Sequence, residues 1–199
     1  MKRFIKMISL ALVAITLISV FPTYKVNAGS NEIDAFKKYL PKVYAQVKKD
    51  SYLPFSKVKY AFFDINNDGK NEMIAYDSSN PYSKGYIYQY KNKKVSRIKC
   101  ISNFQPSRNI DTLDIYIYKK KKVIKTGALS AQTNNNYYYK YKRGKYVLVA
   151  ESGENSESET AYYKVNGKKV NKSKYKKYVK KLVKGAKKKK ASKLLWYEY

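Results

Sequence analysis

Between residues 57 and 170 one local pattern occurs four times: an aromatic run, a short basic turn and a run of branched residues. The clearest copies read YIYQYKNKKV and TAYYKVNGKKV, in which alternate residues are apolar. Such alternation places the apolar side chains on one face of an extended strand. The Asn166-Gly167 pair in the last copy is the strongest short signal for a two-residue hairpin. The sequence therefore predicts antiparallel hairpins over 57–170. The unequal spacing favours a meander over a propeller repeat, since the copies begin near Tyr86, Tyr116, Tyr137 and Tyr162.

Two segments with helical periodicity flank these hairpins. Residues 29–50 predict a helix whose apolar side chains recur at intervals of three and four and form one stripe, Ile33, Phe36, Leu40, Val43 and Val47. Residues 171–185, NKSKYKKYVKKLVKG, predict a lysine-rich helix that Asn171 or Ser173 can cap and Gly185 can end. Residues 186–199 form a basic and aromatic tail, whose end KLLWYEY we expect to be a last strand. The expected fold is α+β and mainly β: an antiparallel meander between an N-terminal helix and a C-terminal lysine-rich helix, in a single domain over 29–199.

The first 28 residues predict a secretory signal peptide. Lys2, Arg3 and Lys6 precede an apolar run over 8–21, and small residues at Val26 and Ala28 suit a signal peptidase. A membrane anchor is the alternative, but the run is shorter than the roughly 20 residues that a spanning helix needs. We therefore expect cleavage after Ala28 and a secreted, extracellular protein.

Residue types that are absent or scarce limit the chemistry. The chain has no histidine and one cysteine, Cys100, so a Ser-His-Asp triad, a Cys-His pair and a histidine zinc site are excluded. A mechanism using carboxylates alone stays open, but with only 14 acidic residues we expect no enzyme. We expect the lone thiol to be buried as a small apolar residue. A secreted chain without disulfides fits export by a Gram-positive bacterium.

The polar stretch DINNDGKNE, residues 64–72, interrupts two strand-like runs. Asp64, Asn66 and Asp68 alternate, a glycine follows, and Glu72 lies four residues beyond Asp68. Calcium takes six to eight oxygen ligands, which alternate side chains of a tight loop can supply, with the Lys70 carbonyl as a further oxygen. The EF-hand pattern fails, because its twelfth position falls on an alanine and the flanks are strand-like. A bare turn is the alternative, since Asn, Asp and Gly dominate turns; a turn alone would not require Asp64 and Glu72.

The pattern D-x-N-x-D-G-x-x-E resembles the calcium loops between strands of integrin-type β-propellers. Together with the helix and hairpin segments quoted above, it resembles a group of uncharacterised secreted proteins from Firmicutes. This resemblance implies an exported domain with a structural Ca²⁺ site formed by Asp64, Asn66, Asp68, the Lys70 carbonyl and Glu72. An asparagine stands at position 66 where many such loops have a third aspartate. We therefore expect an affinity on the order of 10⁻⁴–10⁻³ M, as in other extracellular modules.

Charge is the strongest pointer to partners. Removal of residues 1–28 takes away four of the 43 basic side chains and no acidic one, which leaves a net charge of +25. Anionic cell-wall polymers, lipid headgroups and host glycans attract such a surface, although the lysines can also serve solubility alone. Nucleic acid is not expected, because the chain is predicted to be exported. The acidic run ESGENSESE, residues 151–159, lacks the alternating oxygens of a cation loop and predicts a solvated hairpin loop.

These observations favour a secreted, noncatalytic module with a structural calcium loop and a basic surface for anionic wall or host polymers. The alternative is a metal-free cell-wall or carbohydrate-binding domain of the adhesin type, which would use the tyrosine faces of its strands.

Overall fold

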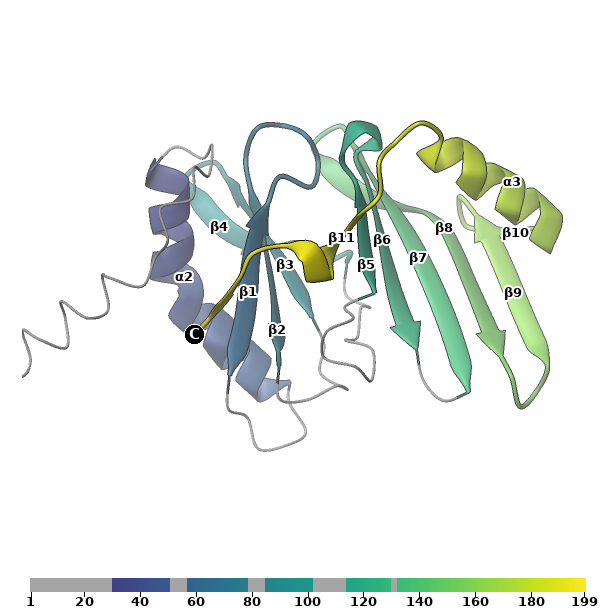
Figure 1. Cartoon of the computed structure of the whole chain (residues 1–199), viewed down its shortest axis with the longest axis horizontal. Coiled ribbons are helices and arrows are strands. Elements are labelled where there is room, and N and C mark those ends of the chain that lie inside the picture. Colours follow the sequence, from purple (N-terminus) through teal and green to yellow (C-terminus); the bar gives the residue numbers. More distant parts are fainter. Residues whose placement is uncertain (1–29, 51–56, 79–84, 102–113, 130–131) are drawn as a thin grey trace, which may run out of the picture.

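The structure, a computed structural model, describes residues 30–50, 57–78, 85–101, 114–129 and 132–199 (Figure 1). The predicted signal peptide lies outside these ranges. Within them the protein is mainly β, with antiparallel sheets and two helices, so the predicted class is confirmed at this level. No helix in this part of the chain is both long enough and apolar enough to span a bilayer.

Sheet 1 has the strand order β12-β1-β2-β3-β4. Its strands are β1 (Val58–Phe63), β2 (Glu72–Asp77), β3 (Tyr86–Lys91), β4 (Lys94–Arg97) and β12 (Trp196–Glu198). Strand β2 is buried along its whole length, because both faces of sheet 1 are covered. The last strand pairs antiparallel with β1, which confirms the prediction of a strand in KLLWYEY.

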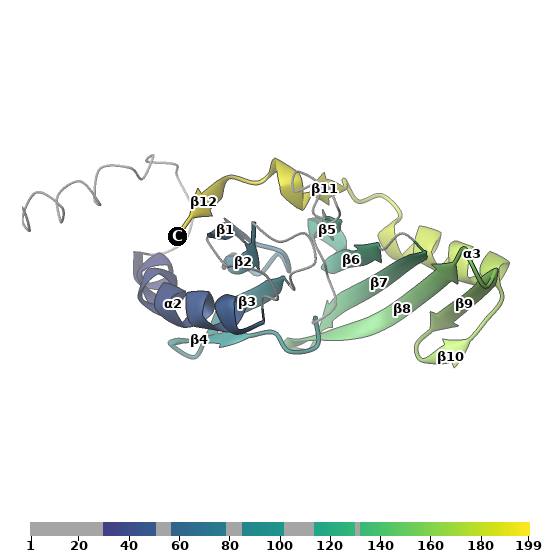
Figure 2. The same cartoon turned by 90° about the horizontal axis from the view of Figure 1, so that it is seen from below.

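Sheet 2 has the strand order β10-β9-β8-β7-β6-β5-β11. Its strands are β5 (Ile115–Tyr118), β6 (Val123–Leu129), β7 (Thr133–Lys142), β8 (Lys145–Asn155), β9 (Thr160–Val165), β10 (Lys168–Lys169) and β11 (Lys189–Lys190). Short 3-10 turns occupy 119–121 and 191–193. Strands β7 and β8 are the longest and carry sheet 2 away from sheet 1 (Figure 2).

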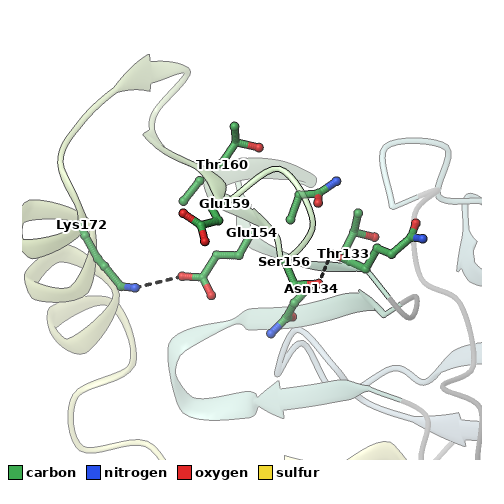
Figure 3. Close-up of a pocket in the computed structure, with 10 residues that line it drawn as sticks. Thr133, Asn134, Glu154, Ser156, Glu159, Thr160 and Lys172 are labelled. Carbon is green, nitrogen blue, oxygen red and sulfur yellow. Dashed lines mark hydrogen bonds and ion pairs between the residues drawn. The ribbon is translucent and has the colours of Figure 1, made fainter.

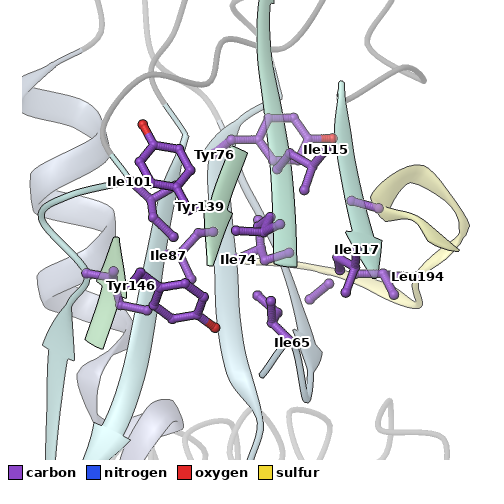
Figure 4. Close-up of a cluster of buried hydrophobic side chains, with 14 residues drawn as sticks. Ile65, Ile74, Tyr76, Ile87, Ile101, Ile115, Ile117, Tyr139, Tyr146 and Leu194 are labelled. Atoms are coloured by element: carbon purple, nitrogen blue, oxygen red, sulfur yellow. The ribbon is translucent and has the colours of Figure 1, made fainter. Parts of the chain in front are cut away.

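Two hydrophobic clusters hold these layers together. Helix α2 (Ser30–Lys49), which is continuous through Pro41, packs on one face of sheet 1 through the predicted stripe residues Phe36, Leu40, Val43 and Val47. The other face of sheet 1 packs against sheet 2, and isoleucines dominate this contact (Figure 4). Among them Ile74 and Ile87 belong to sheet 1, while Ile117 and Ile124 belong to sheet 2.

The strands divide between two sheets, where the sequence predicts one meander over 57–170. Neighbours along the chain do pair in antiparallel fashion, from β1 to β4 and again from β5 to β10. The tail then crosses from sheet 2 to sheet 1, and adds β11 beside β5 and β12 beside β1 (Figure 1). Local alternation determines which strands form hairpins, but it carries no signal for where one sheet ends and the next begins.

Several hairpins turn at residues with left-handed backbone. Both central residues have positive φ in the turns Asn92-Lys93, Arg143-Gly144 and Asn166-Gly167. This is the geometry of a type I′ turn, whose twist matches that of antiparallel strands. The hairpin predicted at Asn166-Gly167 is confirmed by the pairing of β9 with β10.

The second helix, α3 (Lys172–Val183), lies against β9 of sheet 2. Asn171 caps it, since its side-chain oxygen accepts a hydrogen bond from Lys174 N at 2.8 Å. Tyr175 is buried, and its ring contacts the ring of Tyr163 with centroids 5.3 Å apart.

The expectation that Cys100 is buried is wrong. The residue is exposed, in the turn that follows β4, and its thiol donates a hydrogen bond to the carbonyl of Tyr146 at 3.4 Å. Ile98 and Ile101 are buried on either side of this turn, and Lys99 and Cys100 at its tip are exposed.

Candidate cation loop and lysine surface

The predicted calcium loop connects β1 to β2 and occupies residues 64–71. Asn67 and Gly69 have positive φ, so the backbone turns sharply at these two places. The loop lies at one end of sheet 1, where the neighbouring residues of β1 and β2 pair in register, Phe63 with Glu72.

Asp64 organises the loop backbone. Its Oδ1 accepts a hydrogen bond from Asp68 N at 3.1 Å, and its Oδ2 accepts one from Gly69 N at 3.2 Å. The same carboxylate forms an ion pair with Lys119, in the 3-10 turn between β5 and β6, at 2.9 Å from Nζ to Oδ2. The cation that contacts Asp64 in this structure is therefore a lysine from a turn of sheet 2.

Glu72 and Asn66 form the buried part of the loop. Glu72 is 2% exposed, and its two oxygens accept hydrogen bonds from Ile65 N at 2.8 Å and Asn66 Nδ2 at 2.6 Å. Asn66 is 1% exposed, and its Oδ1 is a buried acceptor without a hydrogen-bond partner. A buried polar atom of this kind costs free energy, so an unpartnered oxygen in a loop rich in carboxylates is a ligand-like feature.

The pKa of Glu72 is raised to about 8. Burial is the main cause, because it disfavours the charged carboxylate, and the nearby charges of Asp68, Asp64 and Glu32 add to the shift. The hydrogen bond from the Ile65 amide acts in the opposite direction. A cation placed near these carboxylates would favour the charged form.

Glu32 is a residue of this region that the sequence interpretation did not assign to it. Its Oε1 accepts a hydrogen bond from Asn71 N at 2.6 Å, so the first turn of α2 is tied to the loop. Burial raises its pKa as well, and Asp68 and Asp64 contribute. The sequence does contain a signal for its burial. Glu32 lies four residues before Phe36, on the same face of the helix as the apolar stripe, and a side chain on that face is expected to be buried.

The remaining predicted ligands lie on the outside of the loop. Asp68 is exposed, and its Oδ1 accepts a hydrogen bond from Lys70 N at 2.9 Å. Lys70 is also exposed. In the part of the chain that the structure describes, no three side chains of His, Cys, Asp or Glu form a group that could hold a metal ion. The loop thus brings Asn66 and Glu72 into contact, while Asp64 and Asp68 mainly bind backbone amides.

These contacts bear on the choice between a cation loop and a bare turn. Asp64 and Glu72 accept hydrogen bonds from three loop amides in total, of Ile65, Asp68 and Gly69. Backbone donors in a tight turn need such acceptors whether or not an ion is present. The two acids therefore have a structural role of their own, and the unpartnered Asn66 oxygen is the feature that a turn alone leaves unexplained.

The second candidate site is a run of lysines along the chain, which we call the lysine band. It comprises the eleven lysines of residues 172–190, a segment without a single acid that includes α3 and the chain that leads to sheet 1. All but Lys190 are exposed. Among the described residues Lys172 is the one member that pairs with a carboxylate, that of Glu154 at 3.1 Å.

The acidic run of residues 151–159 lies in β8 and the turn to β9, next to the start of α3, where Lys172 pairs with Glu154. The predicted solvated loop is confined to residues 156–159, which are exposed in the hairpin turn from β8 to β9. Residues 151–155 belong to β8 instead, and Ser152 is buried, so the prediction is wrong for this half of the run. Glu151 pairs with Lys164 at 2.7 Å. Four of the 14 acids are therefore concentrated in one short segment of sheet 2.

Comparison with known proteins identifies no relative: no family model, no curated protein and no solved structure matches the chain. Function is therefore inferred from the chain's own residues.

Proposed function

We propose that this chain is a noncatalytic extracellular module that binds anionic polymers through the lysine band. The observation that carries the proposal is the band itself: eleven lysines within 172–190, ten of them exposed, and a single carboxylate partner among the described residues. Unneutralised ammonium groups on one surface create a positive potential that attracts polyanions and concentrates them there.

The arrangement of the band suits a long, flexible polyanion. Exposed lysines follow one another along α3 and then along the extended chain to β11, so successive anionic groups of a polymer can each meet an ammonium group. Solubility alone does not require this concentration, because lysines that serve only solubility are best interspersed with acids. Wall teichoic acids, anionic lipid headgroups and sulfated host glycans share the chemistry that the band would recognise.

Binding to purified Gram-positive cell wall, with and without its teichoic acid, tests this proposal. We expect strong retention on intact wall at low ionic strength, and release as salt rises, because exposed charge pairs are screened over about 10 Å at 0.1 M salt. Removal of teichoic acid should abolish most of the binding. Retention that survives both high salt and removal of teichoic acid would contradict the role of the band.

We also propose that the module has no enzymatic activity of its own. The absence of histidine from the sequence removes the commonest general base, and a carboxylate-only hydrolase would need two facing acids about 5–9 Å apart. The acids with identified roles are already engaged, Asp64 and Glu72 by loop amides and Glu151 by Lys164.

Calcium binding to the loop is the second part of the proposal. The features that support it are the unpartnered oxygen of Asn66 and the buried Glu72 carboxylate. Asp64, Asn66, Asp68, Glu72 and the Lys70 carbonyl would hold the ion, which would neutralise these carboxylates and pin the β1–β2 hairpin. The contacts of Asp64 with Lys119 and with loop amides oppose it, because the ion would compete with them.

Calorimetric titration of calcium into the protein, followed by thermal melting, tests this part. At millimolar calcium we expect measurable heat and a rise in the melting temperature, since a ligand that binds only the folded state stabilises it. Asp68→Asn is the matched variant. It keeps the size of an exposed side chain but removes the charge of a proposed ligand, so it should weaken the response to calcium. If neither heat nor a higher melting temperature appears, the loop is a bare turn.

The second candidate function is sugar binding without a metal, through the tyrosine faces of the strands. One observation favours it: Tyr162 lies across a glycine on a face of sheet 2 and remains 37% exposed.

A further inference from the structure

The outer strands of sheet 2 have two different faces. Helix α3 covers one of them, where the Tyr163 ring packs on Tyr175 and Lys172 pairs with Glu154. Successive side chains of a strand point to opposite faces, so Tyr162 lies on the face away from α3. In register with it are Gly153 of β8 and, next to Gly153, Asn135 of β7.

The ring of Tyr162 lies directly over the backbone of Gly153. A Cβ atom on Gly153 would be 2.3 Å from Tyr162 Cε1 and 2.5 Å from Asn135 Oδ1, so no other residue fits there without displacing them. The glycine thus seats an aromatic ring against the sheet, with an amide oxygen at its edge. Because Tyr162 remains 37% exposed, the ring offers an apolar surface to solvent in a fixed position.

Polar groups surround this ring. Tyr137, two residues along β7 from Asn135, shares a hydrogen bond with Tyr162, and its pKa is raised to about 12, mainly by burial. Lys164 Nζ lies 5.3 Å from the centre of the Tyr162 ring and is held by Glu151 at 2.7 Å. The Tyr162 ring is thus bordered by an amide and a phenol, and the ammonium group of Lys164, paired with a carboxylate, lies over the ring.

A cavity of about 440 Å³ lies at the tip of these strands (Figure 3). Its lining combines Thr133, Asn155 and Thr160, which lie in one register row two positions beyond the row of Tyr162, with Glu154 and Lys172 of the face that α3 covers. Tyr162 and Asn135 do not line it, so the cavity is distinct from the surface of the Tyr162 ring.

We propose that Tyr162, together with Asn135 and Tyr137, binds a pyranose unit of a neutral glycan. A pyranose presents an apolar C–H face, which an exposed aromatic ring accommodates, and a rim of hydroxyl groups, which amide, hydroxyl and carboxylate side chains bind. The charge of this tip selects against a polyanion, because four of the chain's 14 acids lie in residues 151–159. This inference develops the second candidate function and does not depend on the lysine band.

Titration of the full chain with hexamers of glucose and of N-acetylglucosamine, both β-1,4-linked, tests the proposal, with heparin as the acidic comparison. Saturation-transfer NMR and calorimetry should detect millimolar binding of a neutral hexamer that is insensitive to salt. Tyr162→Ala should weaken it about tenfold, a change of about 1.4 kcal/mol, whereas Tyr162→Phe, which keeps the ring, should bind nearly as well as the parent. Tyr199→Ala, which alters a 48% exposed tyrosine in another part of the molecule, is the control and should change nothing.

Three results would overturn the proposal: neither neutral hexamer binds, Tyr162→Ala leaves the affinity unchanged, or Tyr162→Ala weakens heparin binding as strongly as hexamer binding. Thermal melting shows whether each variant folds, and Asn135→Ala provides a second test if Tyr162→Ala does not. Wall binding at low salt is measured in parallel. It should persist in Tyr162→Ala, so failure of the sugar site and failure of the lysine band give different results.

Discussion

Glu72→Ala is expected to lower the free energy of unfolding by about 2–4 kcal/mol, because it leaves two buried donors without an acceptor. These donors are the backbone amide of Ile65 and the side-chain amide of Asn66, both of which bind the Glu72 carboxylate in the folded protein. The substitution also opens a small void at the start of β2, a strand buried along its whole length. Denaturant unfolding in the presence of a chelator measures the effect.

Glu72→Gln is the informative partner of this variant. The introduced amide keeps an oxygen for the Ile65 donor. Its NH₂ group can donate to Asn66 Oδ1 if the Asn66 amide turns over, and Asn66 Nδ2 then takes the place of Oδ1 as the buried atom without a partner. The number of unsatisfied buried groups therefore stays the same, and we expect the stability of Glu72→Gln to be close to that of the parent in chelator at neutral pH. An equal loss for both substitutions would show that the carboxylate charge itself stabilises the loop.

The same carboxylate predicts how stability depends on pH in metal-free protein. The pKa of Glu72 is raised from 4.5 to about 8 in the folded state. Between these values the folded state binds more protons than the unfolded state, so the free energy of unfolding decreases as pH rises. The slope from this group is at most about 1.4 kcal/mol per pH unit. Glu32, whose pKa is also raised by burial, adds a contribution of the same sign.

Melting temperatures from pH 4.5 to pH 8 in chelator, for the parent and Glu72→Gln, check this dependence. The parent should lose stability across the window, and Glu72→Gln should lose much less. Glu159→Gln, which neutralises an exposed glutamate, is the control and should follow the parent. A flat profile for the parent would mean that the carboxylate is better solvated than its burial indicates.

The sequence predicts the local elements of this fold well, for a physical reason. Period-two alternation and the Asn166-Gly167 turn are local signals, and the hairpins that they predict are present. The division into two sheets depends on isoleucines far apart in the chain. Ile74 of sheet 1 and Ile117 of sheet 2, for example, belong to the same buried cluster between the sheets. Alternation marks both as buried but does not identify the partner of either, so a single meander and two packed sheets give the same pattern.

The candidate loop shows the same limit. The spacing of its oxygens was visible in the sequence, and the contact of Asn66 with Glu72 follows from it. The position of Glu32 on the apolar stripe marks it as an acid on the buried face of the helix, but its partner is not predictable from the sequence. Its contact with the Asn71 amide and the ion pair of Lys119 with Asp64 each join segments that are about 40 or more residues apart. Such contacts decide which loop carboxylates remain free for an ion, and spacing alone cannot reveal them.

Replacing four lysines of the band by glutamine is expected to weaken binding to an anionic polymer by roughly a hundredfold to a thousandfold. The residues are Lys174, Lys177, Lys181 and Lys184, which are exposed, lie on one side of α3 and its end, and have no carboxylate partner among the described residues. A lysine near an anionic surface contributes about 1 kcal/mol, and about 1.4 kcal/mol corresponds to a factor of ten. The dependence of affinity on salt should also become shallower, since fewer counterions are released on binding.

A second variant with four substitutions distinguishes binding through the lysine band from general attraction by the net charge. Lys38, Lys48, Lys49 and Lys94 are exposed lysines of α2 and β4, and their replacement by glutamine removes the same charge from another part of the molecule. If the band is the contact surface, this variant should bind wall teichoic acid within a few fold of the parent and with nearly the same salt dependence. If both variants lose affinity equally, attraction to the polymer is a property of the whole basic protein, because long-range charge does not distinguish one lysine from another. Glutamine and lysine have similar helix propensities, so α3 should remain folded in the first variant, and circular dichroism checks that the loss of binding is not a loss of helix.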